Sequence, residues 1–366
     1  MPDNDAPEGF RPPPPTTIWP GDAYGHWAYV VYTLPGTPPG DYWIQVGLFE
    51  RDTWRGLNVL DDNGQIEGLA TRLGPVQIIR PRRPPDLDSL GMDQRAQVEV
   101  GHGLAYVGST QNARSVHGGD TLNLTLFWQA TGAPEQDCLL QAALASSQAT
   151  IPLGDRLPLG RTIHPTTAWR QGEVVRSPHA LRIPPTVDAG TYTIQVTVTD
   201  GREHPLASPI GVGQIVVEPT DRQMVIPPDI GQRLDADLAG QVMLLGYDLA
   251  QMRIGRGGSL PLVLYWQAQG EMQVSYKVFV QLIGPGGVLT QVDAVPVDWK
   301  RPTSGWIAGE VVVDRYTLPI PAGAAPGACS LIVGMYDEST LQRLAVVNAS
   351  GATMADHVVL SQVTLE

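Results

Sequence analysis

The sequence has little basic charge and almost no lysine. Lysine and arginine together number 24 against 37 aspartates and glutamates, the net charge is −13, and the lysines are Lys277 and Lys300. Nucleic-acid affinity depends mainly on basic side chains that neutralise phosphates. This balance disfavours DNA, RNA and anionic lipid as partners.

Cysteine is scarce, and histidine is not clustered. Cys138 and Cys329 fall at non-equivalent places of the repeats described below, which disfavours a disulfide within a repeat and favours small core residues. The seven histidines form no HxxxH pair and lie near no cysteine. The sequence also lacks a GxSxG elbow and a phosphate-binding glycine loop followed by a helix. We therefore expect no metal site, no cofactor and no serine hydrolase.

Long apolar runs are missing as well. Residues 1–17 contain no basic stretch followed by an apolar one, and no run elsewhere is long enough to span a bilayer. We expect that this segment does not itself insert into a membrane.

Glycine and proline, in contrast, are abundant. The 40 glycines and 33 prolines separate short runs rich in Val, Ile, Leu, Thr and Tyr, a punctuation typical of all-β chains. In the middle of the chain we expect strands at 105–110, 121–130, 137–146, 173–183, 190–199 and 212–218. This pattern predicts antiparallel, immunoglobulin-like β-sandwiches, and 366 residues allow two or three of them.

One tryptophan-containing segment recurs three times. Each copy has a Thr/Ser pair, a tryptophan and a Gly-acid pair, and a glycine follows the tryptophan after 21 residues. The tryptophans are Trp19, Trp169 and Trp306, and the glycines are Gly40, Gly190 and Gly327. Each glycine opens an alternating strand at 40–49, 190–199 or 327–336, which we call the landmark strand.

Alternation assigns one face of each landmark strand to a core. The inward sets are Tyr42, Ile44, Val46 and Leu48; Tyr192, Ile194, Val196 and Val198; and Cys329, Leu331, Val333 and Met335. Residues 188–192 also resemble the tyrosine corner of immunoglobulin-type folds.

A second repeat upstream defines the domains. Phe-Trp-Gln-Ala at Trp128 matches Tyr-Trp-Gln-Ala at Trp266, and the second tryptophan follows after 41 and 40 residues. Residues 94–219 and 234–366 therefore form two complete modules, modules two and three, joined by a proline-containing linker at 220–233.

Module one, residues 1–83, contains only the C-terminal half of this pattern and is followed by a linker at 84–93. Half a sandwich exposes a sheet edge and an apolar face. We therefore expect that the sequence begins inside a longer protein, that an upstream part of the same polypeptide is missing, and that module one docks on module two, pairs with another copy or is poorly ordered.

Paired carboxylates are the strongest argument for catalysis. Four acids lie close in sequence, as a glycoside hydrolase would require: Asp293, Asp298, Glu310 and Asp314. However, Glu310 has counterparts at Glu173 and Asp22, and an acid repeated in every module serves the module's own turn. We therefore assign no catalytic residue.

Aromatic faces that could stack on sugars are the second functional signal. Trp128, Trp169, Trp266 and Trp306 recur, as does Trp19, which favours packing positions. Trp27, Trp43 and Trp54 do not recur and are the candidate ligand-binding residues, although they could equally pack on the missing half of module one.

The assembled frame resembles a known family. Residues 276–296, 302–321 and 326–344, with the aromatic-Trp-Gln-Ala strand, are similar to the C-terminal extracytoplasmic β-sandwich repeats of bacterial polytopic membrane glycosyltransferases of the dolichyl-phosphate-mannose-mannosyltransferase-like type. Residues 148–160 of module two depart from this pattern. In that family the catalytic residues lie in the transmembrane part, so the resemblance implies an extracytoplasmic location and an accessory role.

Three functional hypotheses follow. The first is a non-enzymatic, extracytoplasmic accessory region of a larger cell-envelope protein, with a glycan or a cell-envelope protein as partner. The second is a carbohydrate-binding protein, and the third is a sandwich-fold glycoside hydrolase.

Overall fold

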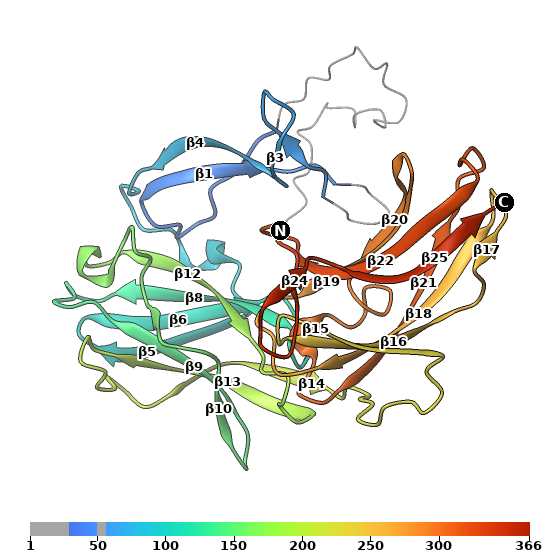
Figure 1. Ribbon diagram of the computed structural model, residues 1–366. Coiled ribbons are helices and arrows are strands. Elements are labelled where there is room, and N and C mark those ends of the chain that lie inside the picture. The colour runs from blue at the N-terminus through green and yellow to red at the C-terminus, as the bar shows by residue number, and fades with distance from the viewer. Residues whose placement is uncertain (1–28, 50–55) are drawn as a thin grey trace.

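The computed structural model describes residues 29–49 and 56–366, and within them the chain is all-β apart from three short 3-10 helices. The predicted fold class is confirmed, because two sandwiches follow one another along the chain (Figure 1). Their strands are antiparallel except for two short ones, Ser115–His117 and Arg253–Ile254, which pair in parallel. Trp19, Trp27 and Trp54 lie outside the described residues.

Module two is a sandwich of two sheets. The first has the order β10 (Thr150–Pro152), β9 (Leu139–Ala145), β13 (Gly190–Thr199), β14 (Ile210–Glu218) and β7 (Ser115–His117), and β11 (Leu157–Pro158) also pairs with β9. The second has the order β12 (Val174–Arg182), β8 (Thr121–Ala130), β6 (Leu104–Gln111) and β5 (Gln94–Gly101). One core of buried residues between Val100 and Val217 fills the space between the sheets.

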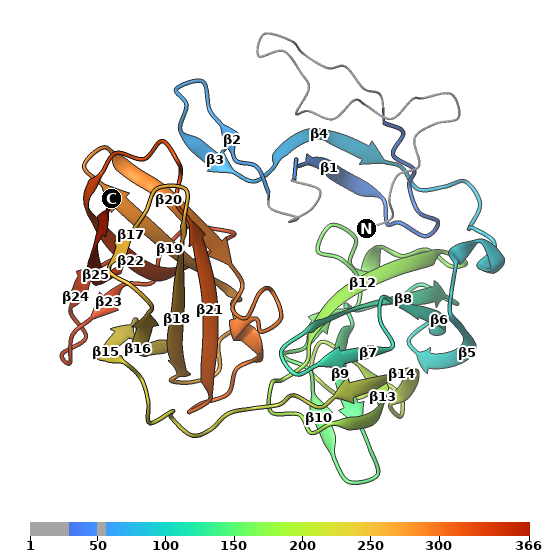
Figure 2. The same cartoon turned by 90° about the vertical axis from the view of Figure 1, so that its right-hand side faces the viewer.

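Module three repeats this plan. Its first sheet has the order β21 (Val311–Pro319), β18 (Ser259–Ala268), β16 (Val242–Leu249), β15 (Gln232–Leu238), β23 (Val346–Val347) and β24 (Thr353–Ala355). This sheet corresponds to the second sheet of module two, with β23 and β24 added at one edge. The second sheet of module three has the order β17 (Arg253–Ile254), β25 (Val358–Leu365), β22 (Gly327–Asp337), β19 (Tyr276–Gly284) and β20 (Gly287–Ala294). A separate core runs from Leu238 to Leu365. Figure 2 shows the two sandwiches side by side.

The alternation of apolar residues explains these strands. β8 and β18 have the same order of buried and exposed positions, and every second side chain points into the core. Both free cysteines are buried, as expected for core residues. Tyr192 Oη donates to Asp188 O at 2.9 Å, and Tyr42 Oη donates to Pro38 O at 2.9 Å, so the tyrosine corner is present in modules two and one.

A glycine bulge recurs in the strand that pairs both with the first strand of each complete module and with the aromatic-Trp-Gln-Ala strand. Gly108 in β6 and Gly246 in β16 have φ of 156° and 155° at a shift in strand register. A Cβ at these positions would lie 2.4 Å from Gln94 O and 2.2 Å from Gln232 O. Only glycine allows the neighbouring strand to approach this closely.

Both predicted linkers pack against the sandwich that follows them. Leu90, in the 3-10 helix η2 (Leu87–Leu90), is buried on the outer face of one sheet of module two, and Ile230 is buried in the equivalent place on module three. β15 also begins at Gln232, inside the predicted linker, because Asp248 Oδ1 accepts from Gly231 N at 2.7 Å and holds this segment beside β16.

Module one is a thin layer over module two. β1 (Gly40–Val46) pairs antiparallel with β4 (Thr71–Ile78), and β2 (Val59–Leu60) pairs with β3 (Ile66–Gly68). Both views place β1 and β4 above β12 (Figures 1 and 2). Arg176 N of β12 donates to Gly36 O at 2.7 Å, and the Arg161 guanidinium lies 5.5 Å from the ring centroid of Tyr42. Docking on module two, one of the three expected arrangements, is therefore the one observed.

Candidate functional site

The recurring acid of module three is part of a joint between modules. Glu310 is fully buried, and its two carboxylate oxygens form ion pairs with Arg222 and Arg301, while Ile307 N donates to Oε2 at 3.1 Å. Arg222 comes from the linker after module two and also donates to Gly305 O and to Pro185 O of module two, both at 2.8 Å. One carboxylate therefore stabilises its own turn and fixes the preceding linker.

Glu173 occupies the same position in module two. Arg80, which follows module one's β4, lies 3.2 Å from Glu173 Oε2 through Nε and donates from Nη2 to Ala168 O at 2.8 Å. His164 Nε2 lies 2.9 Å from Oε1, and Arg170 N donates to Oε2 at 2.9 Å. Burial raises the pKa of Glu173, but these hydrogen bonds and the nearby Arg80 charge outweigh it and hold the pKa below its usual value.

These contacts give the recurring acids a structural role. A general acid or base needs an oxygen that can reach a substrate, whereas both oxygens of Glu173 and of Glu310 are occupied by donors from the chain. The predicted role in the module's own turn is seen in the bonds from Arg170 N and Ile307 N. The role in the joint is additional.

Two other acids from the sequence cluster have different environments. Asp314 is fully buried and accepts hydrogen bonds from Val297 N at 2.8 Å and Tyr316 Oη at 2.6 Å, and burial raises its pKa. Asp298 is at the surface, 4.0 Å from Lys300 Nζ. Asp314 thus supports the turn at 297, and Asp298 faces solvent.

The recurring tryptophans are packing residues. Trp169 and Trp306 directly follow the 3-10 helices η3 (Thr166–Ala168) and η4 (Thr303–Gly305), and their Nε1 atoms donate to the carbonyls five residues earlier at 3.2 and 3.1 Å. Trp128 and Trp266 are fully buried in the two cores. None of the four presents a ring face to solvent.

The non-recurring tryptophans behave differently. Trp43 on β1 is 57% exposed. Trp299, which was not among the predicted binding residues, is 43% exposed, and its ring centroid lies 4.6 Å from Lys277 Nζ. Val297, Asp298 and Trp299 all have positive φ, an uncommon backbone for three successive non-glycine residues. The rule that singled out Trp43, lack of recurrence, would also have found Trp299.

The largest accumulation of exposed apolar side chains is on module one. The described part of the chain has 28 exposed large apolar residues, and 15 of them lie between Tyr29 and Ile79. This segment makes up only about one-seventh of the described residues. We call these 15 the module-one apolar surface: Tyr29, Val30, Val31, Tyr32, Leu34, Trp43, Val46, Leu48, Phe49, Leu57, Leu60, Ile66, Leu73, Val76 and Ile79. Apolar surfaces of this kind mark interaction sites.

The equivalent residues of module two are buried by neighbouring strands, whereas those of module one are exposed. Val46 and Leu48 are 42% and 65% exposed, whereas Val196 and Val198, at the same places in β13, are 0% and 2% exposed. Val76 on β4 is 45% exposed against 1% for Ile215 on β14. Full burial of such a side chain contributes roughly 1.5–3 kcal/mol. The expected uncovered face is therefore present.

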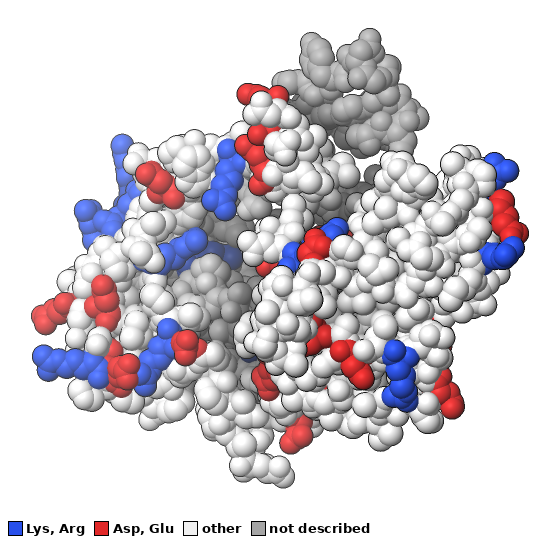
Figure 3. Space-filling view, in the orientation of Figure 1, with Lys and Arg blue, Asp and Glu red and all other residues white. Residues whose placement is uncertain are grey.

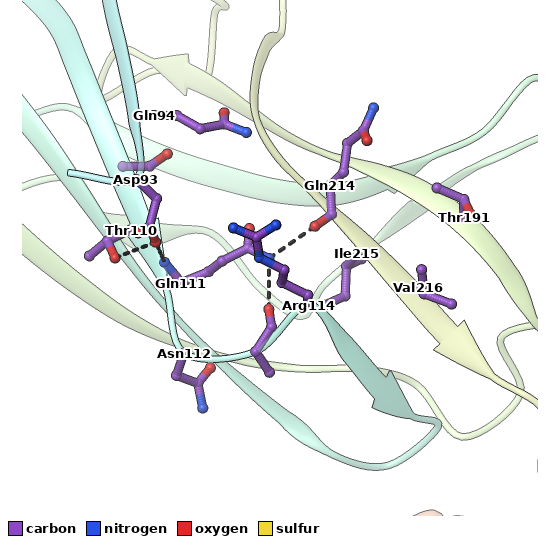
Figure 4. A pocket seen from close by; sticks show the side chains of 12 residues that line it. Asp93, Gln94, Thr110, Gln111, Asn112, Arg114, Thr191, Gln214, Ile215 and Val216 are labelled. Carbon is purple, nitrogen blue, oxygen red and sulfur yellow. Dashed lines mark hydrogen bonds between the residues drawn. The ribbon is translucent and has the colours of Figure 1, made fainter.

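A polar pocket of about 490 Å³ lies in module two, between the end of β6 and β14 (Figure 4). Asp93 accepts from Thr110 Oγ1 at 2.6 Å and from Gln111 N, which lowers the pKa of Asp93. Gln111 Nε2 donates to Ala113 O at 2.7 Å and Gln214 O at 2.9 Å. Its lining has no aromatic ring, so the pocket suits a small polar molecule rather than a stacked sugar.

Basic and acidic side chains are interspersed over the coloured part of the face in Figure 3. Among the described residues, no three His, Cys, Asp or Glu side chains are grouped so that they could hold a metal ion. Over the same part of the chain, no helix has the length and hydropathy to cross a membrane.

We compared the chain with known proteins. No family model matches the chain, and no curated protein matches it. Among solved structures, a Niemann-Pick type C2 protein from Japanese carpenter ant is 5% identical with a TM-score of 0.24, over 31% of this chain and 91% of that one. A protein of Corynebacterium diphtheriae described as membrane-anchored is 12% identical with a TM-score of 0.21, over 72% of this chain and 58% of that one.

Proposed function

We propose that this chain is a non-enzymatic, extracytoplasmic accessory region of a larger cell-envelope protein, of the membrane glycosyltransferase kind suggested by its repeats. The observation that carries the proposal is the module-one apolar surface, since it concentrates 15 of the 28 exposed large apolar residues on one small module. Such a surface is suited to binding another polypeptide. The occupied carboxylates of Glu173 and Glu310 support a non-catalytic role.

The joints support a role in positioning. Arg222 bonds both to Pro185 of module two and to Glu310 of module three, and Arg182 Nη2 donates to Met272 O and Ser304 O at 2.6 Å. A Cβ on Gly119 of module two would lie only 2.2 Å from Gly305 Cα. Contacts this close hold modules two and three at a fixed distance and orientation, as a spacer requires.

Location and activity test this proposal together. The native gene, epitope-tagged after Glu366, would be expressed in its own host, and protease would be added to intact cells. We expect the tag to be lost while a cytosolic marker survives, and we expect the upstream reading frame to encode several apolar spans. A tag that stays protected until lysis, or glycoside turnover that disappears with Glu310→Gln in a folded protein, contradicts the proposal.

Carbohydrate binding is the second candidate, favoured by one observation. Trp299 presents an exposed indole beside Lys277, whose ammonium also pairs with Glu338. An aromatic face next to charged hydrogen-bonding groups can bind a sugar ring. Glycan-array binding that is lost with Trp299→Ala or Trp43→Ala, and retained with the buried-core control Trp169→Phe, would establish this function.

A further inference from the structure

We propose that the polar pocket between β6 and β14 of module two binds a small zwitterion of the α-amino-acid class. The carboxylate of this ligand pairs with the guanidinium of Arg114, and its ammonium group pairs with the carboxylate of Asp93. The proposed accessory role does not use this pocket, so the binding site is a second property of the chain.

The charges of the lining select this class of ligand. The pocket volume of about 490 Å³ is within the range of small-molecule sites. Asp93 is the only acid and Arg114 the only base among the residues that line it. An anion without an ammonium group would face the charge of Asp93, and a cation without a carboxylate would face that of Arg114. A zwitterion complements both charges.

The two charged groups are neighbours, as the adjacent charges of an α-amino acid require. The hydroxyl of Thr110 and the backbone N of Gln111 donate to Asp93, and with the nearby Arg114 charge they lower the pKa of Asp93, which is therefore ionised at neutral pH. Both hydrogen bonds that described residues make to Asp93 end on Oδ2, so Oδ1 can accept from an ammonium group. Figure 4 shows Arg114 between the β6 wall and the β14 wall.

Specific contacts hold the two walls together. Gln111 Nε2 donates to Ala113 O at 2.7 Å and to Gln214 O at 2.9 Å, which fastens the end of β6 to β14. A Cβ on Gly213 would lie 2.4 Å from Gln111 Oε1, so glycine at this place makes room for the amide. The pocket is therefore a built feature of module two.

Module three has different residues at the same places. Val216 N donates to Arg114 O at 3.0 Å in module two, and the same bond in module three runs from Thr364 N to Met252 O at 2.8 Å. Met252 therefore stands in the place of Arg114. By the same spacing, Leu249 and Ser361 stand in the places of Gln111 and Gly213. Since module three folds as the same sandwich, folding does not require the polar lining.

Calorimetry on the full-length protein tests the proposal with four probes. L-Glutamine carries both charges, N-acetyl-L-glutamine lacks the ammonium group, L-glutamine amide lacks the carboxylate, and glucose is an uncharged polyol. Asp93 and Arg114 are exposed, so we expect L-glutamine to bind with a Kd in the millimolar range. The other three probes should bind at least about tenfold more weakly, because each lacks a hydrogen bond to a charged group.

Three variants complete the test. Arg114→Met introduces the residue of module three, Asp93→Asn removes the other charge, and each should weaken L-glutamine binding at least about tenfold. The control Arg202→Met, which removes an exposed arginine of the same module outside the pocket, should leave binding unchanged. Thermal melts check that each variant is folded.

Four results would overturn the proposal. They are binding of N-acetyl-L-glutamine or of the amide as tight as that of L-glutamine, equally tight binding of glucose, unchanged binding by Arg114→Met, and no binding of any common amino acid at millimolar concentration. None of them affects the cell-surface test of the accessory role.

Discussion

Glu310→Gln is the sharpest test of the joint between modules two and three. The substitution keeps the shape of the side chain and removes the charge that faces Arg222 and Arg301. The carboxylate is fully buried, and the two arginine side chains are only 16% and 23% exposed. Two guanidinium groups would then lack their counter-charge in a site with little water.

The burial of this ion pair determines how much stability the substitution should remove. Removing one partner of a fully buried ion pair costs about 3–5 kcal/mol. The glutamine still accepts one hydrogen bond and the arginines are partly hydrated, so we expect roughly 2–4 kcal/mol of lost stability. For a domain of this size that lowers the Tm of module three by roughly 8–15 °C.

Calorimetry and small-angle X-ray scattering measure the two consequences separately. Glu310→Gln should lower the Tm of module three, and Arg222→Ala should also increase the radius of gyration because the linker is released. The matched control is Glu366→Gln. Glu366 forms an ion pair with Arg253 in which both side chains are exposed, and such a pair contributes less than about 1 kcal/mol. A Glu310→Gln protein that melts within about 2 °C of the native protein would refute the reasoning.

Three further predictions concern modules one and two. Tyr192→Phe removes the bond to the Asp188 carbonyl and should lower the free energy of unfolding by about 1 kcal/mol in urea titrations. Burial lowers the pKa of His179 to about 4, so the unfolded chain binds a proton at this residue more readily than the folded chain does. The free energy of unfolding should therefore be independent of this residue's titration above about pH 6.5 and should fall as the pH is lowered towards 4. Urea titrations across that range should show a weaker pH dependence for His179→Gln. Arg80→Ala removes the contact with Glu173, so chymotrypsin should cut before residue 94 faster than in the native chain while residues 94–366 stay intact.

The regular strands could be predicted because their sequence signal is local. β8 and β13 begin and end at the predicted residues, since apolar side chains alternate along their whole length. β5 was missed because Val100 is its only buried residue, and its position depends on pairing with β6 rather than on its own pattern. The uncovered face of module one was also predictable, as absence of the upstream repeat is visible in the sequence.

The joints could not be predicted, because their spacing is not constant. Arg80 lies 93 residues before Glu173, whereas Arg222 lies 88 residues before Glu310, so aligning the repeats does not reveal the pairs. The second donor also changes type, from His164 in module two to Arg301 in module three. Recurrence identified the acids as structural, but their partners depend on the path of each linker in three dimensions.

The two joints differ in strength, and the difference matches the proposed roles of the modules. Glu173 has a side-chain exposure of 9% and one arginine partner, whereas Glu310 is fully buried between two arginines. Loss of one partner costs more as water is excluded from an ion pair, because the remaining charge stays desolvated. Modules two and three therefore form the fixed part of the array, and module one is attached through the more hydrated of the two joints.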